Sequence, residues 1–308
     1  MPPPSQSQSS ARNSTSSKPR LRTVSALINP AAGSVRPGAE DDLRRLLAEH
    51  GCELRAFNMT GRNLEAVVRE AVSVSSDLLV VLAGDGTARL AADLAGPEGP
   101  LIAPLAGGTL NMLPHALYGA VSWNDALRAT LNEGVERMVS GGRIDGRSFY
   151  VAAVLGAPAL WGRAREALRS GSLSQLRRRV TFAIRRAFAG GLVYGADGLE
   201  GGDTEALVLI CPLVSKAMQD ECALEMAALD LHDAREMLGL AFSGVLGAWR
   251  SDASVSVKAT QRGWATMRRS IPSILDGEPH RLPRRVEFEF VPRAFRALAP
   301  ADRSVSSL

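Results

Sequence analysis

Short apolar runs and amphipathic segments alternate regularly along the first half of the chain. The apolar runs have strand length and occupy residues 23–28, 53–57, 77–82 and 101–105. Segments whose apolar residues have helical spacing follow them at residues 39–50, 63–72, 87–95 and 109–117. Strands and helices that alternate in this way form a mostly parallel sheet with helices on its faces. The alternation therefore predicts an α/β domain over residues 22–141.

The pattern changes near residues 140–143. Glycine-containing turn pairs interrupt residues 135–156, and further short apolar runs occur at residues 206–214, 254–259, 265–277 and 284–291. Gly-Gly and Asp-Gly pairs mark turns between strands. We therefore expect a β-rich, sandwich-like second domain over residues 142–300. The predicted fold class is α/β, with an N-terminal Rossmann-like parallel-sheet domain and a C-terminal β-rich domain.

Both ends of the chain differ from folded protein in composition. Residues 1–21 are rich in serine and proline, which predicts a disordered tail, and residues 301–308 form a second tail. The first tail has no hydrophobic segment of the secretory type; its serines and basic residues also resemble a transit peptide, and we favour a plain tail. No apolar run reaches the ~18 residues of a membrane span. The three cysteines have no metal-ligand spacing, and they fit reduced thiols in a cytoplasmic protein.

The basic residues are nearly all arginine. Only three of the 36 basic residues are lysine, and the net charge is +4. Guanidinium groups bind phosphate in a bidentate manner, so a phosphate-bearing partner fits this composition. A general preference of the proteome for arginine explains it equally well.

An amphipathic, Arg-rich helix is expected near residues 173–188. Its apolar positions share one arc of a helical wheel, and its arginines fall on the other side. Such a helix can lie on an anionic membrane, which would place the protein peripherally at the inner face of the membrane. The alternative is that the apolar face packs on the β-rich domain. Few aromatic residues interleave with the arginines, so we expect no nucleic-acid partner.

Three loops rich in glycine follow strands of the predicted parallel sheet. Ligands bind at the carboxyl ends of such strands, and glycines there let backbone N–H groups approach a phosphate. Asp85 stands between two glycines and fits a Mg²⁺ ion bound to phosphates. The alternatives are turns without a ligand and an aspartate that caps a helix. The candidate residues are Asn29, Gly33, Gly84, Asp85, Gly86, Thr87, Gly107, Gly108, Thr109 and Asn111.

These motifs resemble a known family. NPAAG, AGDGT and PLAGGTLN, in this order and spacing, resemble the catalytic domain of the diacylglycerol kinase family, which includes bacterial lipid kinases, sphingosine kinases and, more remotely, NAD kinases. IDGRSFYVAAVLG resembles the strands that open the second domain of that family. ILDGEP and the segment after it resemble its late Asp-Gly-Glu loop and closing strand. An Asp-Gly pair alone would predict only a turn; here it favours the lipid-kinase branch.

The resemblance implies an ATP- and Mg²⁺-dependent kinase that transfers the γ-phosphate of ATP to a lipid hydroxyl, with the nucleotide in a cleft between the domains. It assigns nucleotide binding to the glycine loops listed above and the Mg²⁺ side to Asp85. Asp276 would accept the proton of the attacking hydroxyl, with Glu278 nearby on the acceptor side. Diacylglycerol, sphingoid bases, phosphatidylglycerol and polyprenols all present such a hydroxyl beside apolar chains. Exposed strand edges in the second domain would also allow a homodimer.

The chain departs from the family pattern at four places. Ala83 replaces a glycine, Leu90 and Met112 replace acids, and Arg36 is the basic residue nearest to the position of a missing lysine. Asp85 and Asp276 are retained, which favours an active enzyme. Two alternatives stay open: a degenerate, non-catalytic member that binds nucleotide or lipid, and an NAD kinase.

Overall fold

A computed structural model describes residues 19–156, 191–197, 199–215, 222–229 and 256–300. The expected Arg-rich helix near residues 173–188, the tail at residues 301–308 and most of the first tail lie outside the described residues. No helix in the described part of the chain is long and apolar enough to span a membrane.

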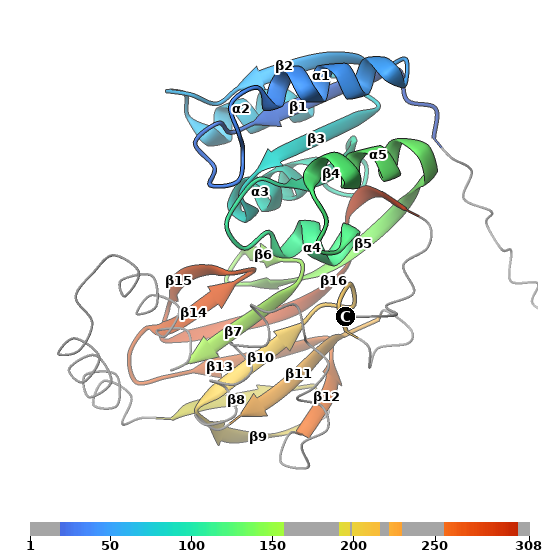
Figure 1. The fold of residues 1–308 in the computed structure, drawn as a ribbon. Helices are drawn as coiled ribbons and strands as arrows, with labels where there is room; N and C mark the ends of the chain where they lie inside the picture. Colours follow the sequence, from blue (N-terminus) through green and yellow to red (C-terminus); the bar gives the residue numbers. More distant parts are fainter. Residues whose placement is uncertain (1–18, 157–190, 198, 216–221, 230–255, 301–308) are drawn as a thin grey trace, which may run out of the picture.

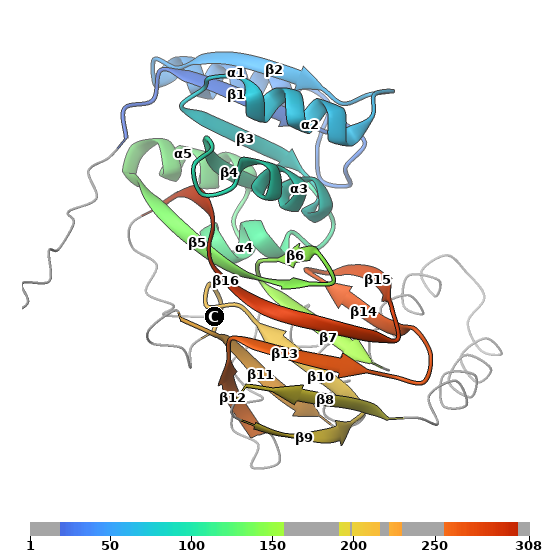
Figure 2. The same cartoon turned by 180° about the vertical axis from the view of Figure 1, so that it is seen from behind.

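The first half of the chain forms the expected α/β unit (Figures 1 and 2). Its four strands pair in parallel in the order β2-β1-β3-β4, with α1 and α5 on one face and α2 and α3 on the other. The elements are β1 (Thr23–Ile28), α1 (Ala39–Glu49), β2 (Glu53–Asn58), α2 (Leu64–Ser73), β3 (Leu78–Ala83), α3 (Asp85–Ala95), β4 (Leu101–Ala106), α4 (Met112–Tyr118) and α5 (Trp123–Glu133). Every residue of β3 is buried, as the apolar run predicted.

Helix α5 was not predicted from the sequence, although its start carries a recognisable signal. The Ser122 side chain accepts a hydrogen bond from the Asp125 N–H group, and its hydroxyl donates to the Asp125 carboxylate. This is the arrangement of a capped helix N-terminus. The buried residues Ala126, Leu127, Thr130 and Leu131 then have helical spacing.

The second half of the chain is β-rich, which confirms the predicted fold class. Its strands belong to two sheets, and the second of these has the order β12-β11-β10-β7-β14-β15 with antiparallel pairing throughout. The strands are β5 (Gly134–Ile144), β6 (Arg147–Phe149), β7 (Ala152–Gly156), β8 (Leu192–Ala196), β9 (Leu199–Thr204), β10 (Ala206–Ile210), β11 (Leu224–Leu229), β12 (Ser256–Thr260), β13 (Arg262–Thr266), β14 (Ile271–Leu275), β15 (Glu278–Leu282) and β16 (Arg285–Pro300). Residues of both sheets share one apolar core, as in a sandwich.

Strands β5 and β16 join the two halves of the molecule. Strand β16 pairs with β13 near its start, with β5 along most of its length, and in parallel with β4 through Ala297 and Ile102. The parallel sheet of the first unit is therefore continuous with one sheet of the sandwich. The expected boundary between residues 141 and 142 falls inside β5, and the division into domains stays a prediction.

We expect the Phe295→Ala substitution to lower the free energy of unfolding by about 3–5 kcal/mol. Phe295 is fully buried in β16 and packs edge-on against Tyr150, with ring centroids 4.9 Å apart. Chemical denaturation measures the change. The control is Val193→Ala, at an exposed side chain of β8, for which we expect less than about 0.5 kcal/mol. An equal effect of both substitutions would contradict a shared core at this joint.

Candidate active site

Hydrogen bonds tie together the three loops at the carboxyl edge of the parallel sheet. The Asn29 N–H group donates to the Leu82 carbonyl (3.1 Å), which connects the first loop to the end of β3. Ser34 donates through its N–H group to the Gly107 carbonyl (3.0 Å) and through its hydroxyl to the Gly108 carbonyl (2.6 Å). The structure therefore brings the predicted residues of all three loops together.

Glycines 107 and 108 are required by the packing of these loops on one another. A Cβ atom on Gly108 would lie 2.7 Å from the Gly84 Cα atom, and one on Gly107 would lie 2.8 Å from the Ala83 nitrogen. Any larger residue would push two backbones apart. The sequence suggested that these glycines allow a ligand to approach the backbone. The structure shows a close approach of backbone to backbone, and contact with a nucleotide stays a prediction.

Asn111 fixes the shape of the third loop. It is buried, has a left-handed backbone (φ 52°), and its side chain makes two hydrogen bonds with Gly108: the amide oxygen accepts from the N–H group (2.7 Å) and the amide nitrogen donates to the carbonyl (3.0 Å). Thr109 is exposed beside it, and the Thr109 hydroxyl lies toward Gly33 of the first loop. Thr87 lies buried in the first turn of α3.

Asp85 is the first residue of helix α3, but its side chain contacts the start of helix α4. Its Oδ1 atom accepts a hydrogen bond from the Leu113 N–H group (3.3 Å). Burial raises the pKa of Asp85 to about 6; the negative charge of Asp276 adds to this, and hydrogen bonds from the backbone of α4 oppose it. Asp85 therefore links the N-terminus of α3, where it lies, to the N-terminus of α4. The alternative from the sequence, that Asp85 caps a helix, referred to α3.

Asp276 lies in the tight turn between β14 and β15. It and Gly277 both have positive φ angles, 45° and 84°, as two-residue hairpin turns require. Its side chain accepts hydrogen bonds from the N–H groups of Tyr150 (2.7 Å), Val151 (2.8 Å) and Ala152 (3.0 Å). Only 3% of the residue is exposed. Burial raises the pKa of Asp276 to about 6, against the effect of these three hydrogen bonds.

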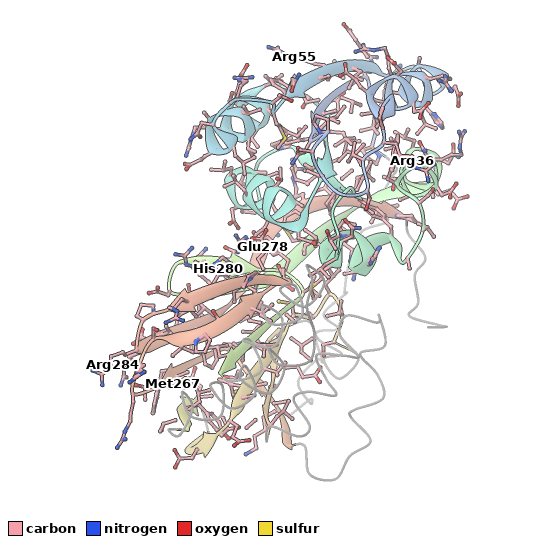
Figure 3. All side chains as sticks on the ribbon, turned by 60° about the vertical axis from the view of Figure 1, so that its left-hand side comes forward. Arg36, Arg55, Met267, Glu278, His280 and Arg284 are labelled. Carbon is pink, nitrogen blue, oxygen red and sulfur yellow. The ribbon has the colours of Figure 1, made fainter. Side chains whose placement is uncertain are left out.

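The turn at Asp276 packs against the loops of the first unit. A Cβ atom on Gly277 would lie 2.5 Å from Leu110 Cδ1 and 3.1 Å from Met112 Sδ. The Glu278 carboxylate lies directly over Gly86 in the first turn of α3. Figure 3 shows Glu278 and His280 nearer to the first unit than Arg284 and Met267. Asp85, Gly86, Asp276 and Glu278 thus come together at one junction.

Four further residues of this junction were not predicted from the sequence: Arg89, Asp93, Tyr150 and His280. Arg89 lies one helical turn after Asp85 and contacts Glu278 and His280; Tyr150 donates a hydrogen bond from its hydroxyl to Asp93, another turn along α3. Asp85, Arg89 and Asp93 have the spacing of one helix face. This spacing was the one signal in the sequence for these residues. It shows that the three side chains share a face of α3, but not that this face meets the second sheet.

Leu90 and Met112, which replace acids of the family pattern, make apolar contacts. Leu90 packs against the core of the first unit, and Met112 packs against the same core and contacts Gly277. In the described part of the chain no group of three or more acidic, histidine or cysteine side chains could hold a metal ion. Mg²⁺ bound to phosphates needs only one or two carboxylates. The residues present therefore fit a cation that phosphates would carry, and Asp85 is the carboxylate that would hold it.

Solved structures share this two-part fold. A diacylglycerol kinase from Bacillus anthracis str. Sterne matches with a TM-score of 0.64 and 15% identity over 92% of this chain and 99% of that chain. A second protein of that strain, provisionally assigned as a diacylglycerol kinase, matches with a TM-score of 0.66 and 15% identity over 94% of this chain and 100% of that chain. At such identities the likeness shows the fold.

The sequence of the first unit also matches a known family. Residues 23–142 match the model of the diacylglycerol kinase catalytic domain. The resemblance drawn from the three loop motifs is therefore confirmed over these residues, and the match supports an enzyme of the kinase class. A comparison with curated proteins finds no match to the chain.

We expect Asp85 to make stability depend on pH between about pH 4 and pH 6. Its pKa rises from 3.8 in the unfolded chain to about 6 on folding, so its contribution is present below pH 4 and is lost as the pH rises through 6. The free energy of unfolding of the wild type, measured relative to Asp85→Asn by denaturant titration, should therefore fall across this range.

The matched control is Asp77→Asn. Folding lowers the pKa of Asp77 because backbone N–H groups of Thr23 and Arg22 donate to its carboxylate. The wild type should therefore gain stability relative to this variant as the pH rises toward 4. The same direction of change for both variants would contradict the assigned burial of Asp85.

Proposed function

We propose that the protein is an ATP- and Mg²⁺-dependent lipid kinase that transfers the γ-phosphate of ATP to the hydroxyl of a diacylglycerol-like lipid. The observation that carries this proposal is the meeting of two acids from distant parts of the chain. Asp276 lies close enough to Asp85 for its charge to raise the pKa of Asp85, and each has a pKa of about 6. Paired titratable groups at a junction are characteristic of catalytic sites.

The first unit supplies the nucleotide side. The loops at Asn29, Gly84 and Gly107 meet where helix α3 begins, and no side chain caps that helix. The dipole at this N-terminus favours an anion such as a phosphate chain. When bound, Mg²⁺ would neutralise charge on the phosphates, and Asp85 would hold it from the protein side.

The second sheet supplies the base. With a pKa of about 6, Asp276 is mainly ionised at neutral pH, and three N–H groups fix the orientation of its carboxylate. It would accept the proton of the lipid hydroxyl as the hydroxyl oxygen bonds to the γ-phosphorus and the bond to the β-phosphate oxygen breaks. ADP and a phosphorylated lipid then leave. Glu278, over Gly86, lies between the two sides.

The proposed acceptor is a lipid because of the family match and the late Asp-Gly-Glu turn. Attachment to the membrane through residues 173–188, a homodimer and a position at the inner face of the membrane stay predictions. Two alternatives have specific support. Apolar Leu90 and Met112 favour a non-catalytic member that binds nucleotide or lipid. The glycine loops, which also resemble those of NAD kinases, are compatible with an NAD kinase.

Labelled ATP separates these three functions. Purified protein incubated with Mg²⁺, labelled ATP and a panel of diacylglycerol, sphingosine, phosphatidylglycerol and polyprenol should transfer label to one lipid. We expect Asp276→Asn and Asp85→Asn each to lower transfer by at least about 100-fold, because one removes the base and the other the cation ligand. Nucleotide binding without transfer would support the non-catalytic alternative, and transfer to NAD would support the third.

The pH dependence of kcat/KM gives an independent test. A general base must be ionised, so we expect kcat/KM to rise with pH and to level off above an apparent pKa of about 6. Asp85 titrates in the same range, so the rise of kcat/KM with pH reports the titration of Asp85 and Asp276 together. A rate that stays constant from pH 5 to pH 8 would argue against Asp276 as the base.

A further inference from the structure

Arg89 has incomplete hydrogen bonding for a guanidinium group that is largely buried. Only 18% of its side chain is exposed at the contact between α3 and β15. Its polar contacts with described residues are long: Nη2 lies 3.3 Å from Glu278 Oε2, and Nη1 lies 3.4 Å from His280 Nε2. Guanidinium groups can donate about five hydrogen bonds, usually at about 2.7–3.2 Å. A largely buried guanidinium group with two long contacts therefore has N–H donors available for an anionic group.

A second polar group, on the strand that pairs with β15, has no hydrogen-bond partner among the described residues. The Ser273 hydroxyl is 1% exposed and makes no hydrogen bond with the described residues. In the register of β14 and β15, Ser273 lies opposite His280, and Leu275 lies opposite Glu278. Opposed residues of antiparallel strands point to the same face of the sheet. Ser273, His280 and Glu278 therefore belong to one face, and Glu278 and His280 of that face contact Arg89.

Two arginines at this point can pair with an anion. Burial and, after it, the positive charges of Arg89 and Arg147 lower the pKa of His280, so the imidazole is neutral at neutral pH and is not a competing cation. Glu278 is the acid that contacts Arg89. The two arginines therefore bring positive charge to a junction that also holds the acids Asp85, Asp276 and Glu278.

We propose that Arg89 is a phosphate-binding residue and that a phosphate group of the ligand displaces Glu278 as its partner. The proposal rests on the proposed function and adds a binding residue that the loop motifs do not contain. Side chains on a helix lean toward its N-terminus, so Arg89 reaches back toward the start of α3. A phosphate can accept two parallel hydrogen bonds from one guanidinium group, whereas Glu278 makes a single contact with Arg89. The phosphate belongs either to the end of the nucleotide or to the headgroup of an acceptor phospholipid.

Calorimetric titration of the full-length protein tests this proposal without requiring phosphate transfer. The ligands are Mg-ATP, Mg-ADP, dioctanoyl phosphatidylglycerol and dioctanoylglycerol. We expect Arg89→Gln to weaken the binding of a phosphate ligand by about tenfold, because a charge-assisted bidentate contact is lost. Glu278→Gln should tighten the same binding by about threefold, because the competing carboxylate is removed. In the double variant, which carries Arg89→Gln and Glu278→Gln, the tighter binding caused by Glu278→Gln should disappear.

The matched control is Arg69→Gln, which removes an exposed Arg–Glu pair from neighbouring helix α2. It should bind every ligand within about twofold of the wild type. A loss by Arg89→Gln that affects ATP but not ADP identifies the terminal phosphate of the nucleotide. A loss confined to phosphatidylglycerol identifies a lipid headgroup.

Two results would overturn the proposal alone: unchanged binding of every phosphate ligand by a folded Arg89→Gln variant, or weaker binding by Glu278→Gln. Circular dichroism and thermal denaturation establish that the variants are folded. A wild type that binds none of these ligands would overturn both this proposal and the proposed function.

Discussion

The junction between the two parts of the molecule depends on one buried carboxylate. Asp276 accepts hydrogen bonds from three consecutive backbone N–H groups, at Tyr150, Val151 and Ala152, where β7 begins. Because both oxygens are held, the turn that carries Asp276 has a fixed orientation, and Gly277 is pressed against Leu110 and Met112. Glu278 and His280 follow in β15, so their positions opposite α3 are consequences of the same constraint.

Helix α3 is the element that both sides of the site share. Its first turn meets the glycine loops, whereas Asp85, Arg89 and Asp93 lie on one face and contact α4, β15 and Tyr150, respectively. A single rigid helix therefore sets the distance between the predicted phosphate position and the turn at Asp276. Proximity of this kind is what phosphoryl transfer requires, since most of its catalysis is positioning and charge stabilisation.

Local patterns in the sequence predicted the parts of this structure whose determinants are local. Strand β3 and the glycine loops were predicted because an apolar run and a high glycine content define them in the sequence itself. The apolar run at residues 284–291 indicated only the first half of β16, whereas the resemblance to the family placed the closing strand in the segment that continues from there. The strand runs past a bulge to Pro300, because its second half pairs with β5 and β4 from distant parts of the chain. Arg89, His280 and Tyr150 were missed for the same reason: their contacts exist only after the two units meet.

Met112, one of the two apolar residues that replace acids of the family pattern, changes the contacts at the junction. Met112 contacts Gly277 by packing, at a place where an acid would have put a third negative charge near Asp85 and Asp276. Burial already raises the pKa of each of these two acids to about 6, and another buried carboxylate would raise both further. Arg89 has the opposite effect on Asp276, whose pKa its charge lowers. The charge of Arg89 therefore favours the ionised form of the proposed base, and a methionine at position 112 adds no negative charge that would oppose it.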